Sequence, residues 1–134
     1  MSRSGYIYDW DDQWEMIRYR GAVFRAIKGK RGQAFLRELL AILDAMPEKR
    51  LIANKLETPE GVCALGAIGR ARGINLQILD PEDPTQLALV FNIADALVRE
   101  ITYENDEAVF YNEPPDVRFR RFRDWLTSVI NAPA

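Results

Sequence analysis

The stretch KGKRGQAFLRELLAILDAMP, residues 28–47, decides the fold class of this 134-residue chain. Apolar side chains recur in it every three or four positions, which is the spacing of one face of an α-helix. They are Phe35, Leu36, Leu39, Leu40, Leu43 and Met46. Pro47 follows the last of them, and proline does not continue a helix because it lacks a backbone N–H. The stretch therefore predicts a helix over residues 33–46.

A similar pattern precedes this stretch and predicts a helix over residues 10–28. Its apolar stripe consists of Trp10, Trp14, Ile17, Phe24 and Ile27. Gly21 lies on the same stripe, where the missing side chain allows another helix to approach closely. Between the two patterns, Gly29 and Gly32 are expected to take positive φ and, with the cations beside them, to end the first helix. Two helices joined by a tight glycine turn predict an αα-hairpin.

The middle of the chain contains a turn signal that has two interpretations. Residues 58–61, TPEG, carry proline second and glycine fourth, as in a type I turn. Either residues 51–57 pair with those around Val62 in a small β-hairpin, or Thr58 caps a helix with Pro59 in its first position. We favour a hairpin that passes directly into a helix over residues 63–72.

This third helix is rich in small residues, which predicts a central position. Each glycine in a helix costs roughly 1 kcal/mol relative to alanine, so close packing against neighbours is needed to offset it. The small residues are Ala64, Gly66, Ala67, Gly69 and Ala71. Gly73 is expected to cap the C-terminal end.

Three more helices are predicted in the second half of the chain. A short one is opened by Asp83 and Pro84 and runs to Phe91, and another covers residues 95–104. Residues 105–115 form a loop, and the last helix covers residues 116–130. The sequence thus predicts a mainly α fold with about five or six helices in a single compact domain. Residues 10–131 make up this domain, and residues 1–9 and 132–134 are expected to be tails.

Composition argues against most conventional catalysis. The chain has no histidine, which removes the commonest general base and metal ligand, and its one cysteine, Cys63, excludes an internal disulfide. We therefore expect neither an enzyme nor a cofactor. The net charge of −2 gives no whole-molecule attraction to nucleic acid, and no apolar run approaches the roughly 20 residues that span a bilayer. No membrane partner is expected, and a reducing cytoplasm, bacterial or of an infected host cell, is the simplest setting.

Three segments carry a resemblance to known sequences. They are RGAV (residues 20–23) with GKRGQAFLRE (29–38), then VCALGAIGRARG (62–73), then YENDE (103–107) followed by the Arg and Trp residues of the last helix. Together they resemble a group of small uncharacterised proteins encoded in phages, prophages and proteobacterial genomes. The resemblance implies a phage or mobile-element context. It implies no activity and no functional residue.

Two groups of residues near the start of the chain are candidate contact sites. The first is aromatic and consists of Tyr6, Tyr8, Trp10 and Trp14. If exposed, it is a hot spot for a protein partner; if buried, it attaches the N-terminal segment to the body. The second is basic and consists of Arg18, Arg25, Lys28, Lys30 and Arg31. A phosphate backbone can lie along such residues, but a solvated face is the simpler interpretation, because neither helix is expected to place exposed aromatics among these charges.

Two further features have weaker functional interpretations. Glu104, Asp106 and Glu107 follow a predicted helix C-terminus, where the helix dipole disfavours acidic groups, so this cluster is the most interesting of the acidic ones. Loop solvation nevertheless explains it more simply. Cys63 near a helix N-terminus has no histidine to activate it, and cysteine is commonly buried, so we expect a packing role.

These observations favour a non-enzymatic protein–protein interaction module of phage or mobile-element origin. Its expected partner is a host or phage protein, and modulation of a host process such as defence fits the context. The alternative is a small nucleic-acid-binding protein that uses the basic residues of the first helical hairpin. A homo-oligomer is a further option, with the glycine-rich third helix as its seam if that helix lies outside.

Overall fold

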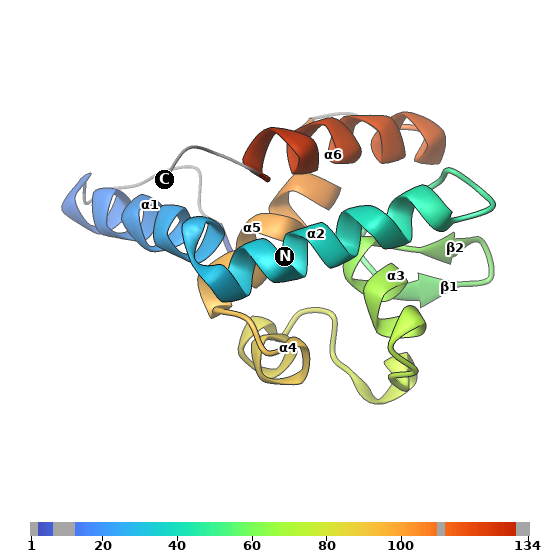
Figure 1. Cartoon of the computed structure of the whole chain (residues 1–134), viewed down its shortest axis with the longest axis horizontal. Coiled ribbons are helices and arrows are strands. Elements are labelled where there is room, and N and C mark those ends of the chain that lie inside the picture. Colours follow the sequence, from blue (N-terminus) through green and yellow to red (C-terminus); the bar gives the residue numbers. More distant parts are fainter. Residues whose placement is uncertain (1–2, 7–12, 110–111, 131–134) are drawn as a thin grey trace.

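The computed structural model describes residues 3–6, 13–109 and 112–130, with the backbone alone for residues 13–15. The described part is mainly helical and forms a single compact domain, as predicted (Figure 1). Its elements in chain order are α1 (Gln13–Lys28), α2 (Lys30–Ala45), β1 (Glu57–Thr58), β2 (Gly61–Val62), α3 (Ala64–Ala71), the 3-10 helix η1 (Leu76–Ile78), α4 (Pro84–Phe91), α5 (Asp95–Asp106) and α6 (Pro115–Val129).

The joint between α1 and α2 is tighter than the sequence predicts. Gly29 alone separates the helices, with φ −65° and ψ 157°, and Gly32 lies inside α2. The expectation that these glycines take positive φ is therefore wrong. Gly32 is needed for another reason: a Cβ on it would lie 1.9 Å from the carbonyl oxygen of Ala26 at the end of α1. From this joint α2 runs through the middle of the molecule, while α1 forms one end of it (Figure 1).

The core lies between α2, α3, α4, α5 and α6. Helix α3 is at its centre, as predicted, because six of its eight residues are buried. Its glycines allow the close approach: a Cβ on Gly66 would lie 1.9 Å from the carbonyl oxygen of Leu56, and one on Gly69 would lie 2.6 Å from the side chain of Leu76. Around α3, the buried side chains that close the core are Phe35, Leu36, Leu39 and Leu43 of α2, Leu87 and Phe91 of α4, Leu97, Val98 and Ile101 of α5, and Phe119, Phe122 and Leu126 of α6.

The chain enters α3 through the predicted β-hairpin. β1 and β2 pair antiparallel, with Thr58 opposite Gly61. The backbone N–H of Ile52 extends the pairing by donating to the carbonyl oxygen of Val62 over 2.9 Å. Cys63 then caps α3, because its sulfur accepts a hydrogen bond from the N–H of Gly66. The interpretation in which Thr58 and Pro59 open a helix is wrong.

The later helices begin and end close to their predicted bounds, with one useful difference. Asp83 caps α4 as predicted, and Asn92 ends it with a left-handed φ of 56°. Helix α5 continues to Asp106, two residues beyond its predicted end, so Asn105 and Asp106 belong to a helix and not to a loop. This extension turns Asn105 toward the core and brings Asp106 next to the N-terminal residues. No helix in the described ranges is long and apolar enough to cross a membrane.

Candidate interaction surface

Helix α1 has an outer face on which large apolar side chains are exposed to solvent. Ile17 and Phe24 are each 58% exposed. The sequence predicts that both face inward, and this prediction is wrong. The buried side of α1 is instead built around Val23, which is 1% exposed and belongs to a different helical stripe. Gly21 lies between Ile17 and Phe24, and the close helix approach predicted at it is absent: among described atoms, a Cβ there would meet only the guanidinium of Arg25.

Cations border these apolar side chains. Arg18 and Arg25 are exposed and seven positions apart, so they share one side of α1. Lys28 is four positions beyond Phe24, and its Nζ lies 4.5 Å from the centre of the Phe24 ring, within cation–π range. We call this surface the α1 outer face. Its residues are Ile17, Arg18, Gly21, Phe24, Arg25 and Lys28.

The other two basic candidates lie beyond the joint. Lys30 and Arg31 begin α2 and are exposed, and an Arg31 guanidinium N–H donates to Oδ1 of Asn92 over 3.4 Å. Within the part of the chain that the structure describes, no carboxylate forms an ion pair with Arg18, Arg25 or Lys30. The expectation that no exposed aromatic lies among these charges is wrong, because Phe24 is such a residue.

The aromatic candidate group is only partly within the described residues. Tyr8 and Trp10 lie outside them, as does the side chain of Trp14. The Tyr6 ring packs against the rings of Tyr19 and Tyr103, with centroid distances of 5.3 and 5.1 Å. Its hydroxyl donates to Glu100 over 2.7 Å. Tyr6 therefore attaches the N-terminal segment to the body.

Burial and the neighbouring groups raise the pKa of Tyr6. Desolvation is the largest cause, followed by hydrogen bonds with Tyr19 and Glu100. Glu100 also accepts from Arg20 of α1 over 3.2 Å. Glu100 thus ties both the N-terminal segment and α1 to α5.

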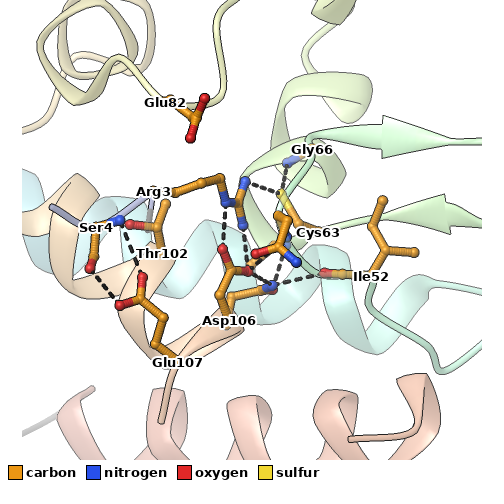
Figure 2. A network of polar contacts seen from close by, with 12 residues as sticks. Arg3, Ser4, Ile52, Cys63, Gly66, Glu82, Thr102, Asp106 and Glu107 are labelled. Carbon is orange, nitrogen blue, oxygen red and sulfur yellow. Dashed lines mark hydrogen bonds and ion pairs between the residues drawn. The ribbon is translucent and has the colours of Figure 1, made fainter. Parts of the chain in front are cut away.

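The N-terminal residues continue this attachment toward Cys63. Arg3 and Ser4 are 3% and 0% exposed, so this part of the predicted tail is packed into the domain. Figure 2 shows the Arg3 guanidinium between Asp106 and Cys63, with Ser4 against Glu107. Cys63 is buried as predicted, and its sulfur also accepts hydrogen bonds.

The acidic cluster of residues 104–107 is divided between two environments. Asp106 and Glu107 bind the N-terminal residues, so the expectation of simple loop solvation is wrong for them. Glu104 lies beside Glu100 and 3.9 Å from Arg121. Burial, reinforced by the charge of Glu100, raises the pKa of Glu104 to about 7, although Arg121 acts in the opposite direction. Among the described residues, no group of three or more Cys, Asp and Glu side chains could hold a metal ion.

One open cleft was not predicted from the sequence. Its volume is about 520 Å³, and it lies between the end of α2, the hairpin turn and α3. Its apolar lining includes Ile42, Met46, Val62 and two alanines of α3, Ala67 and Ala71. Two exposed arginines on its rim are neutralised by ion pairs, Arg50 with Glu48 and Arg70 with Glu57. The signal for this cleft is the alanine pair four positions apart, which leaves space beside α2.

Comparisons with protein-family models, with curated proteins and with solved structures find no match.

Proposed function

We propose that this chain is a non-enzymatic protein-binding module that docks through the α1 outer face onto an acidic surface of a host or phage protein. The observation that carries the proposal is the exposure of Ile17 and Phe24 on one helix face bordered by Arg18, Arg25 and Lys28.

The apolar part of the face supplies binding energy. Removing apolar surface from water contributes roughly 25 cal/mol per Å². Ile17 and Phe24 are seven positions apart on one side of α1, which is the spacing of anchors that a helix inserts into a groove. Gly21 between them presents no side chain, so a partner can approach the α1 backbone there.

The charged part of the face selects the partner. Arg18, Arg25 and Lys28 give this side of α1 a positive field, which favours a partner with carboxylates around its groove. The same charges disfavour a second copy of the chain. An antiparallel pairing of two α1 helices centred on Gly21 would bring Arg18 of one copy near Arg25 of the other, and like charges at an interface repel.

The test is affinity capture from a lysate of the bacterium that carries the gene, with nuclease treatment. The Ile17→Ser/Phe24→Ser double variant is expected to retain less than about a tenth of the protein partner that the unchanged chain retains. Leu89→Ser is the matched control, because Leu89 is 80% exposed on α4, away from this face. Equal capture by the double variant, or the absence of a stoichiometric partner with the unchanged chain, contradicts the proposal.

A second candidate function is single-stranded nucleic-acid binding, favoured by the exposed Phe24 ring with Lys28 beside it. Bases stack on exposed aromatics, and cations nearby bind the phosphates. It predicts that affinity for a fluorescent oligonucleotide falls steeply with salt. The Lys28→Ala/Lys30→Ala/Arg31→Ala variant should give a shallower salt dependence. A flat salt response of the unchanged chain contradicts this function.

A further inference from the structure

Residues 3–6, which we call the N-terminal strap, lie along α5 and are held there by residues in the middle and at the C-terminal end of that helix. Tyr6 binds Glu100, Ser4 binds Glu107, and Arg3 binds Asp106. The strap has the sequence Arg-Ser-Gly-Tyr, and each of these four residues has a different environment on the body of the domain.

The Arg3 guanidinium is a charged group that is almost completely enclosed. Its Nε donates to Oδ2 of Asp106 over 2.6 Å, and a second nitrogen donates to Oδ1 over 2.7 Å. The third nitrogen lies 3.5 Å from Sγ of Cys63, as Figure 2 shows. The two side chains of the pair are 2% and 1% exposed. This planar, two-point contact fits a guanidinium and not an ammonium.

The Asp106 carboxylate, which binds this guanidinium, is held in place by groups outside the strap. Oδ1 of Asp106 also accepts from the N–H of Asn54 over 3.2 Å and from the side-chain amide of Asn105 over 2.8 Å. The Asn105 side chain is in turn fixed, because its amide donates to Ile52 and its oxygen accepts from the N–H of Ala64. Asn54 takes a φ of 71°, in the left-handed region. The carboxylate is thus oriented by the body of the domain, a preorganised site.

Ser4 and Gly5, the next two residues of the strap, are also held by α5 and its C-cap. The hydroxyl of Ser4 donates to Oε1 of Glu107 over 2.9 Å, and its backbone N–H donates to Oε2 over 3.3 Å. Its carbonyl oxygen accepts from Arg99 over 3.1 Å. Gly5 has a φ of 72°, in the left-handed region that favours glycine, and the Arg99 guanidinium lies beside it.

The strap contributes no side chain to the main hydrophobic core, although Arg3 covers Cys63, which is a member of that core. That cluster of buried side chains runs from Phe35 to Ile130 and includes none of the strap residues. Among the described residues, the contacts of the strap include hydrogen bonds, the buried ion pair of Arg3 with Asp106 and the rings around Tyr6. Its departure would leave the other core side chains packed and would uncover Cys63 and Asp106.

We propose that α5, together with Cys63 of the α3 cap, forms a binding site for an arginine-bearing peptide, which the chain's own N-terminus fills in cis as an exchangeable ligand. The site recognises the guanidinium at Asp106, the serine at Glu107 and the tyrosine hydroxyl at Glu100, and the left-handed φ between serine and tyrosine favours glycine. This inference is independent of the α1 outer face and of what that face binds.

The experiment uses the full chain and the thiol of its only cysteine as the reporter. In the unchanged protein, 5,5′-dithiobis(2-nitrobenzoate) is expected to label Cys63 slowly, because the thiol is 1% exposed and covered by Arg3. Arg3→Ala should raise the labelling rate about tenfold or more with an unchanged helical circular dichroism spectrum, because it leaves Asp106 without its cation and releases the strap. Arg120→Ala is the matched control, since Arg120 is exposed on α6 and its loss should leave the rate unchanged.

The peptide Ser-Arg-Ser-Gly-Tyr is then added to the Arg3→Ala variant. Protection of Cys63 should return in a saturable way, whereas the peptide Ser-Ala-Ser-Gly-Tyr should not protect. A labelling rate in Arg3→Ala equal to that of the unchanged chain overturns the proposal, as does equal protection by both peptides or by neither. Loss of the helical spectrum in Arg3→Ala also overturns it, because the strap would then be part of the folding core. Tyr6→Phe, which removes the hydroxyl contacts with Glu100 and Tyr19 and keeps the ring, should raise the rate by a smaller factor, and no rise counts against the site.

Discussion

Helices α1 and α2 have the same length and a similar periodic pattern of apolar residues, yet the two patterns differ in how far they are buried. In α2 the stripe is buried, with Leu36, Leu39 and Leu43 all at 0% exposure. In α1, two of the apolar residues of the predicted stripe, Ile17 and Phe24, face solvent. The difference arises from position: α2 runs through the middle of the domain, while α1 forms one end of it (Figure 1). A helical period identifies residues that share a face, but the neighbouring elements decide whether that face is covered.

The largest effect that tests this comparison is expected in α2. Leu39→Ala should lower the free energy of unfolding by about 2–5 kcal/mol, because it removes a fully buried side chain and leaves a cavity among packed neighbours. Urea denaturation followed by circular dichroism measures it. Leu89→Ala is the control for loss of a leucine, because that side chain is 80% exposed. If the two variants lose similar stability, α2 is not the core helix that its burial indicates.

The glycines of the two helices offer a second contrast. Gly32→Ala should destabilise the protein by about 1–3 kcal/mol, since the new Cβ would overlap the carbonyl oxygen of Ala26 at the joint. Gly21→Ala should instead stabilise by up to about 1 kcal/mol, because alanine favours a helix and the only nearby described atom belongs to a flexible arginine. Opposite shifts in the thermal unfolding midpoint are the expected result. A destabilising Gly21→Ala would mean that another element does pack against the outer side of α1.

The sequence predicted the elements better than it predicted their environments. The amphipathic run of α2, the capping pair Asp83 and Pro84 and the small residues of α3 are local signals, and each gave the correct element. The orientation of α1 is not local, because its sequence offers two stripes, one through Phe24 and one through Val23. Choosing between them requires knowing where α5 lies.

The surroundings of the candidate site residues were likewise not predictable from local sequence. The cations of α1 were found because charge is visible in composition, while the exposure of Phe24 among them was not predictable. The docking of Arg3 on Asp106 joins residues 103 positions apart in the chain. No spacing rule connects such residues, and the lone signal was an acidic cluster at a helix C-terminus, where the helix dipole does not explain it.

A smaller, pH-dependent effect is expected on the side of α5 near α1. Folding raises the pKa of Glu104 from about 4.5 to about 7, so the folded state holds this proton more tightly than the unfolded chain does. The contribution of Glu104 to stability is therefore fully present below about pH 4.5 and is lost as the pH rises through about 7. Urea unfolding at pH 5, 6, 7 and 8 measures the trend.

Glu104→Gln keeps a neutral side chain at every pH and should flatten this part of the stability profile. Glu82→Gln, a change at an exposed carboxylate on the surface, is the control and should leave the profile as it is. A profile of the Glu104→Gln variant that still falls between pH 5 and 8 by the same amount would assign the titration to another group.

The smallest change in the free energy of unfolding is expected for substitutions on the α1 outer face. Ile17→Ala and Phe24→Ala should each change the free energy of unfolding by no more than about 0.5 kcal/mol, because both side chains are already largely in water in the folded chain. Phe24→Ala also gives up the contact of its ring with Lys28, which is worth little at an exposed site. Urea denaturation of the isolated chain, beside Leu39→Ala, gives the measurement. A loss of about 2 kcal/mol or more would mean that these side chains are covered in solution and unavailable to a partner. If the free energy of unfolding hardly changes, the same variants can be used in the binding experiment. Any loss of a partner could then be attributed to the face and not to unfolding.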